Sequence, residues 1–174
     1  MDHYHAGVLF GLTTGLLAGL AFVMFLFKRK ILDMSFDERQ ERARGKAFQY
    51  AFLTLAASAY AYGVSDLVLG RWCDVLTGVT LCFSVSVVVF AVTCILKDAY
   101  LSLREKPRTI MTFFALLSLV NLGFGVMYHL SPGLVENGVL TFRAVNPIIG
   151  SATLVILIVY IVNHLLRPRD EEAE

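Results

Sequence analysis

The residues with the most capacity for chemistry are a few polar side chains inside long apolar runs. Asp66 lies near the end of one run, Asn121 lies near the middle of another, and His129 closes that second run. If such runs cross a membrane, an ionisable residue in them is costly and points to a ligand, an ion path or a buried partner. One interpretation is an outward-facing polar pocket that contains all three residues. The other, which the position of Asp66 favours, is an interfacial carboxylate that reaches water or pairs with Arg71.

Asn121 also has a structural interpretation, and one more pair of polar residues lies inside the runs. Asn121 is followed closely by glycines, which let another helix approach. We expect it to bond Ser84 or Ser86 and so join two helices, an interaction of about 0.6–2 kcal/mol in membranes. Asn163 and His164 close the final run. A histidine there would shuttle protons only opposite a carboxylate, and the other apolar runs contain none at that depth, so we interpret His164 as an interfacial side chain.

Motifs of known enzymes are absent from the sequence. It contains no Gly-x-Ser-x-Gly, His-Glu-x-x-His, phosphate-binding glycine loop or Cys-x-x-Cys. Cys82 and Cys94 are separated by about 18 Å along one helix, so they cannot pair, and Cys73 is interpreted as a lone thiol. We therefore expect no enzyme activity, no catalytic residue, no metal site and no cofactor.

The fold class follows from the apolar runs themselves. Hydrophobic residues make up 57% of the 174-residue chain, whose mean hydropathy is +0.68. Runs of about 20 residues match the roughly 30 Å of a bilayer's hydrocarbon core. The sequence predicts an all-α integral membrane five-helix bundle, a single transmembrane domain over residues 1–174. The expected spans are about 6–27, 47–69, 75–96, 109–130 and 146–166.

Positive charges alternate along this series of spans. Of the 15 Lys and Arg residues, all except Arg71 and Arg143 fall in segments 28–46 and 97–108 or in the tail after residue 166. The positive-inside rule places those segments in the cytoplasm, with the N-terminus outside and the C-terminus inside. The first span is then a retained anchor rather than a cleaved signal peptide. Because acids are interleaved with the basic residues, anionic lipid headgroups are a simpler partner than nucleic acid.

Segment 28–46 is the most polar part of the chain. Ser35 and Glu38 have the spacing of a capping box, and Glu38 lies four residues before Arg42. These features predict a charged helix over residues 36–46 that extends the span 47–69. Its expected function is to contact a protein partner or lipid headgroups through a set of charged residues: Asp37, Glu38, Arg39, Arg42 and Arg44.

Two smaller patterns concern packing. The first span contains a ladder of glycines, one at every fourth position: Gly7, Gly11, Gly15 and Gly19. Such a ladder permits close helix packing, here against another span of the same chain or, as the less favoured alternative, in a homodimer or subunit seam. In the loop 131–145, Asn137-Gly138 between short apolar stretches predicts a type I′ hairpin.

The stretch Asp37-Glu38-Arg39-Gln40, followed by Arg44-Gly45-Lys46-Ala47 at the start of a span, resembles uncharacterised small multi-span bacterial membrane proteins, mainly of Gram-positive organisms. The resemblance implies a bacterial cytoplasmic membrane protein with no established activity. Genes for such proteins often neighbour those for transcriptional regulators or ABC transporters. An accessory, regulatory or interaction subunit is therefore the expected function, and a small transporter or solute-binding component using Asp66 and His129 is the alternative.

Overall fold

The computed structural model describes residues 35–102, 107–130 and 133–166 in full, together with residues 10, 13, 14, 17–21, 24, 25 and 28. The chain divides into two compact units, Met1–Ser35 with Ser102–Glu105, and Phe36–Leu101 with Lys106–Glu174. All of the elements named below belong to the second unit.

The expected first span, 6–27, is described only in part. Its described residues, Gly19 among them, are helical. The remaining glycines of the ladder, Gly7, Gly11 and Gly15, lie outside the described residues.

Helices dominate the second unit. They are α2 Glu38–Leu69, α3 Val75–Leu96, α4 Pro107–Leu130 and α5 Val145–Leu166, with strands β1 Val135–Glu136 and β2 Val139–Leu140 and the 3-10 turn η1 Phe142–Ala144 between α4 and α5. Within the described residues, four helical segments are long and apolar enough to cross a membrane. The chain is thus an all-helical protein with the character of a membrane protein. Helix α2 joins the charged segment 38–46 and the apolar segment 47–69 without a break.

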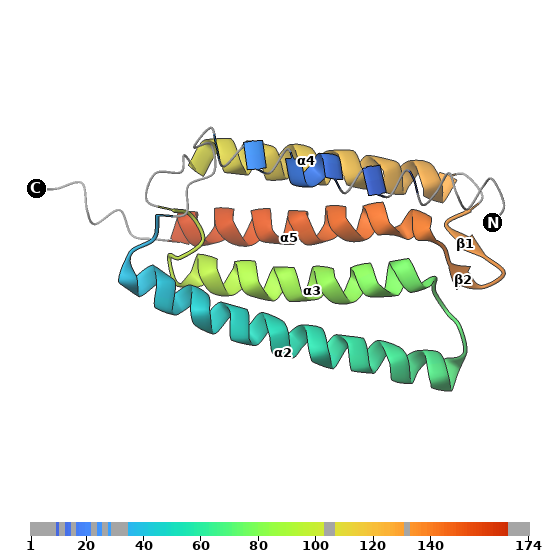
Figure 1. The fold of residues 1–174 in the computed structure, drawn as a ribbon. Coiled ribbons are helices and arrows are strands. Elements are labelled where there is room, and N and C mark those ends of the chain that lie inside the picture. The colour runs from blue at the N-terminus through green and yellow to red at the C-terminus, as the bar shows by residue number, and fades with distance from the viewer. Residues whose placement is uncertain are drawn as a thin grey trace, which may run out of the picture. The chain divides into compact units, whose positions relative to one another are not determined.

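The helices do not pack in the order of the sequence. Helix α2 packs on α3, α3 packs on α5, and α5 packs on α4, so α5 lies between two helices that precede it in the chain (Figure 1). Among these four helices, α2 and α4 therefore take the two outer positions. This order decides which polar residues can meet.

Small residues bring α2 and α3 together. Ala47 is fully buried, and the hydroxyl of Ser86 donates to the carbonyl of Ala51 at 2.8 Å. The rings of Phe48 and Phe90 pack beside this contact, with centroids 4.5 Å apart. In lipid, the burial of apolar surface gives no driving force for helix association. Close approach of the two backbones and hydrogen bonds from hydroxyl groups hold the helices together instead.

Helices α4 and α5 meet in a similar way. Buried Ser118 donates its hydroxyl to the carbonyl of Gly150 at 2.9 Å. Asn121 donates to the Leu117 carbonyl of its own helix at 2.8 Å, so the expected bond to Ser84 or Ser86 is wrong. The reason is the helix order, because α5 lies between α4 and the helix that carries both serines.

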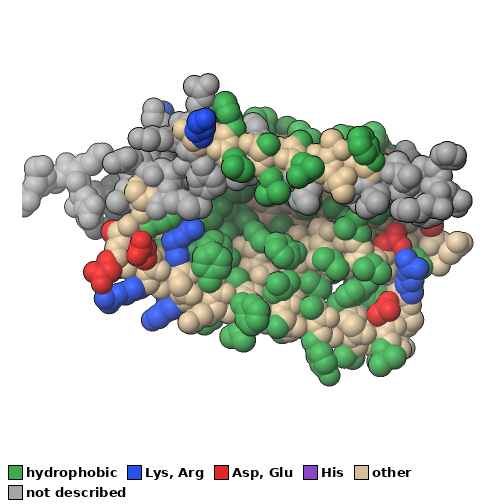
Figure 2. All heavy atoms as spheres, in the orientation of Figure 1, with side chains coloured by type: hydrophobic (Ala, Val, Ile, Leu, Met, Phe, Trp, Pro, Cys, Tyr) green, Lys and Arg blue, Asp and Glu red, His purple; other side chains and the backbone are tan. Residues whose placement is uncertain are grey.

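The outward surface has an apolar middle and charged ends. Figure 2 shows hydrophobic side chains spread over the middle of the helices, with Lys, Arg, Asp and Glu gathered toward the two ends. Large apolar side chains such as Phe52, Leu67 and Leu119 are at least 70% exposed. A surface of this kind is stable where lipid, rather than water, surrounds the middle of the helices.

A hairpin closes the end where α2 finishes and α3 and α5 begin, which we call the hairpin end. Asn137 and Gly138 have φ of 51° and 80°, the left-handed pair that a type I′ turn requires, so the hairpin prediction is confirmed. Leu140 extends the pairing to the α2–α3 turn, donating to the Trp72 carbonyl at 2.9 Å and accepting from the Asp74 N–H at 2.8 Å. This support stabilises a hairpin too short to form alone.

Cys73 lies under this cap. It is fully buried and carries a free thiol, as do Cys82 and Cys94. None of the three cysteines is bonded to another within the chain, and the interpretation of Cys73 as a lone thiol, rather than one that pairs with a second chain, stays a prediction.

The close approach of α4 and α5 predicts a position-specific effect of added methyl groups. A Cβ on Gly150 would fall 2.9 Å from the backbone nitrogen of Leu122, whereas one on Gly123 would meet nothing within 4 Å. We expect Gly150→Ala to lower the free energy of unfolding by about 1–3 kcal/mol through overpacking. Thermal unfolding in detergent micelles measures this.

Gly123→Ala is the matched control. It lies on α4 near the same contact, and alanine gains helix propensity there, so we expect unchanged or slightly raised stability. Equal melting temperatures for the two variants would contradict the proposed close approach.

Candidate functional site

The end of the bundle where α2 begins and α3 and α5 finish carries most of the described basic residues, and we call it the basic end. Helix α2 starts there with a capping box formed by Asp37 and Gln40. The Asp37 carboxylate accepts from the Gln40 N–H at 2.7 Å, and the Gln40 side-chain oxygen accepts from the Asp37 N–H at 3.2 Å. The cap is therefore two residues later than the Ser35–Glu38 box expected from the sequence, and that expectation is wrong.

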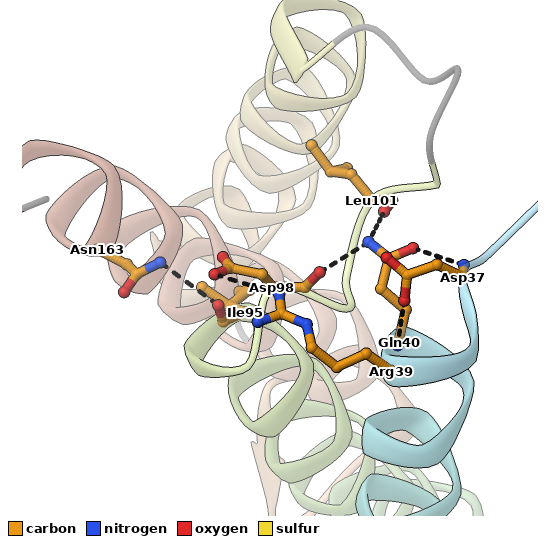
Figure 3. A network of polar contacts seen from close by, with 7 residues as sticks. All are labelled: Asp37, Arg39, Gln40, Ile95, Asp98, Leu101 and Asn163. Atoms are coloured by element: carbon orange, nitrogen blue, oxygen red, sulfur yellow. Dashed lines mark hydrogen bonds and ion pairs between the residues drawn. The ribbon is translucent and has the colours of Figure 1, made fainter. Parts of the chain in front are cut away.

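The Gln40 side chain explains this shift. Its amide nitrogen donates to the carbonyl of Asp98 at 2.8 Å and to that of Leu101 at 3.4 Å. Both carbonyls belong to the segment that follows α3, and Gln40 itself is buried. One amide therefore caps α2 and ties it to the α3 C-terminus (Figure 3). A cap built on Glu38 could not donate these two bonds.

Helix α3 ends in a Schellman motif. The Ala99 N–H donates to the Cys94 carbonyl at 2.8 Å, and the Asp98 N–H donates to the Ile95 carbonyl at 3.2 Å. The left-handed position of this motif usually holds glycine, but here it holds Asp98 with φ of 56°. A left-handed non-glycine residue costs about 1–2 kcal/mol. The chain thus places a carboxylate where glycine would fit with less strain.

The Asp98 carboxylate faces a cation from α2. The Arg39 guanidinium lies 3.9 Å away, and the two side chains are 73% and 39% exposed for Arg39 and Asp98 respectively. An ion pair of this length and exposure contributes little stability. Arg39 can therefore leave Asp98 at small cost.

A cavity of about 250 Å³ opens beside this pair, and we call it the basic-end cavity. Its lining comes from three helices or their ends: Gln40 from α2, Ile95, Asp98, Tyr100 and Leu101 from the end of α3 and beyond, and Tyr160, Asn163 and His164 from α5. Asn163 holds α5 to this end by donating to the Ile95 carbonyl at 3.4 Å. The rings of Tyr160 and His164 stack, with centroids 6.3 Å apart.

The cavity adds an acid near His164 that the sequence reasoning did not consider. The apolar spans supply no acid at its depth, but the turn after α3 does, because Asp98 and His164 line the same cavity. Sequence reasoning missed Asp98, Tyr100 and Tyr160 as site residues. The available signal was an aspartate just after a span, at the position where a helix-ending glycine is common.

The five charged residues expected to contact a partner divide into two groups. Asp37 is used as the cap, and Arg44 points inward, donating to the Ala99 carbonyl at 3.0 Å with its guanidinium 4.0 Å from the Phe36 ring centroid. Glu38 and Arg42 instead form an exposed ion pair at 2.6 Å. With Arg39, they are the members of the set that face outward.

The structure does not bring together the three residues of the expected polar pocket. Asp66 belongs to α2, whereas Asn121 and His129 belong to α4, at the opposite side of the helix series (Figure 1). Arg71, expected to pair with Asp66, instead binds the Asp74 carboxylate at 2.8 Å. The second oxygen of Asp74 accepts from the Phe142 N–H at 3.2 Å, which fixes this carboxylate, and Arg71 with it, at the hairpin end.

Comparisons of the chain with protein-family models, with curated proteins and with solved structures found no match. The site is therefore interpreted from its own chemistry.

The double role of Gln40 predicts a specific loss of stability. Gln40→Glu keeps the oxygen that caps α2 but removes both N–H donors and places a negative charge beside two carbonyls. We expect a loss of about 1–3 kcal/mol, the usual cost of unsatisfied buried polar groups. Thermal unfolding in detergent micelles is the measurement.

Glu41→Gln serves as the control, because Glu41 is the exposed neighbour of Gln40 on the same turn. We expect it to change stability by no more than about 0.5 kcal/mol. If Gln40→Glu proves as stable as this control, the tie between α2 and the α3 C-terminus does not contribute as described.

Proposed function

We propose that the chain is a five-span integral membrane protein of the bacterial cytoplasmic membrane, with its N-terminus outside and its C-terminus in the cytoplasm. Four helices with spanning character and a further apolar stretch over residues 6–27 support the span count. The distribution of Lys and Arg supports the orientation. In this topology the basic end faces the cytoplasm.

We propose a non-catalytic role as an accessory, regulatory or interaction subunit. The working surface is the charged surface formed by Glu38, Arg39 and Arg42. The observation that carries this proposal is that these side chains are 81%, 73% and 77% exposed, while the buried face of the same helix is fixed by Gln40 and Arg44. A rigid helix presenting outward charge suits a protein partner or anionic lipid headgroups.

The transporter alternative receives less support. It needs a pocket shared by Asp66 and His129, and these residues lie on α2 and α4, which take the outer positions of the series. Asp66 is half-buried and His129 is exposed. We therefore keep the interaction role as the conclusion.

The topology is testable by reporter fusions in living bacteria. Five spans place the two termini on opposite sides of the membrane, whereas four place them on the same side. We expect a fluorescent protein fused after residue 174 to fluoresce in the cytoplasm, and a periplasmic phosphatase inserted at residue 137 to be active. An N-terminal epitope tag should be accessible from outside the intact cell. Detection of both termini on one side would contradict the fifth span.

The charged surface is testable without harming the fold. The Glu38–Arg42 pair is exposed and worth only about 0.3–0.5 kcal/mol, and like charges at this spacing cost a similar amount, so Arg42→Glu should lower the free energy of unfolding by no more than about 1 kcal/mol. We expect Arg42→Glu to abolish co-purification of a crosslinked partner and to weaken binding to anionic vesicles. Crosslinking from position 42 in native membranes and vesicle flotation are the measurements.

Glu136→Lys changes charge at the hairpin end and is the matched control. It should leave both measurements unchanged. Arg44 is unsuitable for this test, because its inward contacts would confound binding with stability. Unchanged capture and flotation in Arg42→Glu would reject the charged surface as the working surface.

A further inference from the structure

Helix α2 combines the greatest exposure with the least apolar surface. Among the described helices it packs mainly on α3, and it lies at one edge of the series (Figure 1). Of the four helices with spanning character it is the least apolar, and none of residues 52–69 in its spanning stretch is buried. A helix that meets lipid over most of its surface is expected to be the most apolar. The reverse order indicates that another helix covers part of α2.

Small and polar residues follow one line along the outer side of α2. They recur at steps of three, four or seven residues, which keeps them on one face of a helix, and this face lies away from the buried Ala43, Ala47 and Ala51. We call this line the α2 seam, and all of its members are exposed: Glu38, Arg42, Gln49, Ala56, Ala59 and Gly63. A Cβ built on Gly63 would meet no described atom within 4 Å, so the seam has room for a close neighbour.

The composition of the α2 seam suits a helix better than lipid tails. Ala59 and Gly63 have the small-x-x-x-small spacing that lets two transmembrane helices approach closely. Gln49 is exposed two residues inside the apolar segment 47–69, where an amide facing hydrocarbon needs a polar partner, and glutamines bond across helix pairs in membranes. Phe52, which is 70% exposed on the same face, is a large side chain that small residues on a neighbouring helix can accommodate.

The charges of the α2 seam are complementary to those of a second copy. Two copies inserted in the same direction are related by a two-fold axis along the membrane normal, so their α2 helices run parallel and matching residues face each other. Glu38 and Arg42 are one helical turn apart and already pair within the chain at 2.6 Å. In the parallel arrangement, Glu38 of each copy therefore lies within one turn of Arg42 of the other.

Other occupants match the α2 seam less completely. The first apolar stretch, 6–27, contains no charged residue and is followed by Lys28-Arg29-Lys30, which would repel Arg42. Anionic lipid headgroups would account for Arg42 but not for the small residues deeper in the membrane, such as Ala59 and Gly63. A second copy accounts for the charged and the small members together.

We propose that the chain forms a parallel homodimer in which the α2 seams of two copies pack against each other. Ala59 and Gly63 make the close backbone contact, the Gln49 side chains bond across it, and reciprocal Glu38–Arg42 pairs join the copies at the basic end. Exposed ion pairs contribute little affinity, so the small residues carry most of it. The inference names a second copy as the partner of the charged surface, and so rests on the interaction role proposed above.

Cysteine crosslinking of the full-length protein in native membranes tests the contact. Oxidation with copper phenanthroline should join Ala56→Cys chains into a disulfide-linked dimer, because matching residues of the α2 seam meet near the two-fold axis. Ala57→Cys is the matched control, since Ala57 is exposed at the same depth but lies about 100° further round the helix. It should stay monomeric. The wild type, whose three cysteines are buried, gives the background.

Energy transfer between donor-labelled and acceptor-labelled copies in lipid vesicles measures the affinity. Gly63→Leu should raise the dissociation constant about tenfold or more, the effect of overpacking a close contact. The space around Gly63 within the chain lets the variant fold unchanged, which circular dichroism checks. Ala57→Leu adds the same bulk outside the α2 seam and should leave the dissociation constant unchanged.

Charge exchange separates a second copy from lipid. Glu38→Arg and Arg42→Glu should each weaken self-association by a factor of about two to five, the worth of exposed ion pairs. An equimolar mixture of the two variants should restore energy transfer to the wild-type level, because opposite charges then face each other. A surface that binds anionic lipid instead would be strengthened by Glu38→Arg.

Three outcomes would overturn the homodimer. The first is equal crosslinking, or none, at positions 56 and 57. The second is a disulfide within one chain between Ala56→Cys and Gly19→Cys, which would assign the α2 seam to the first apolar stretch. The third is capture of a different protein from position 42 while Ala56→Cys stays monomeric, which would uphold the interaction role and reject the homodimer alone. Loss of both captures would reject both.

Discussion

Helices surrounded by lipid gain little by burying apolar surface against one another, and this constraint explains the packing of the second unit. Its helices meet through small residues and through hydroxyls that donate to main-chain carbonyls of a neighbour, as Ser86 does to Ala51 and Ser118 to Gly150. Bulky side chains such as Phe52 face outward. The buried centre is consequently made of alanine, glycine, serine, threonine and cysteine more than of large apolar side chains.

Close packing leaves the ends of the helices as the places where polar groups must be satisfied, and at each end one side chain bonds two segments of the chain. At the basic end the Gln40 amide caps α2 and serves two carbonyls after α3. At the hairpin end the Asp74 carboxylate binds Arg71 and the Phe142 N–H. Segments distant in sequence are thereby joined.

Local features could be predicted from the sequence, whereas features set by helix order could not. Asn137-Gly138 specified its turn because the backbone conformation depends on those two residues alone. The overlapping capping boxes of Ser35 and Asp37 are equivalent locally, and the contacts of Gln40 with residues almost 60 positions away decide between them. The expected pocket of Asp66 and His129 does not form, and the shared cavity of Asp98 and His164 was missed, because both depend on the position of α5 between α3 and α4.

The central position of α5 has a consequence for biosynthesis. Helices leave the ribosome in sequence order, and a hairpin of neighbouring helices could in principle assemble as soon as its second member is inserted. Helix α2 can dock on α3 in this way, but among the described helices α4 finds its packing partner only when α5 arrives. Until then the α4 face that carries Ser118 and Gly125 has no partner among the described helices, so this half of the bundle can pack only after the last helix has been inserted.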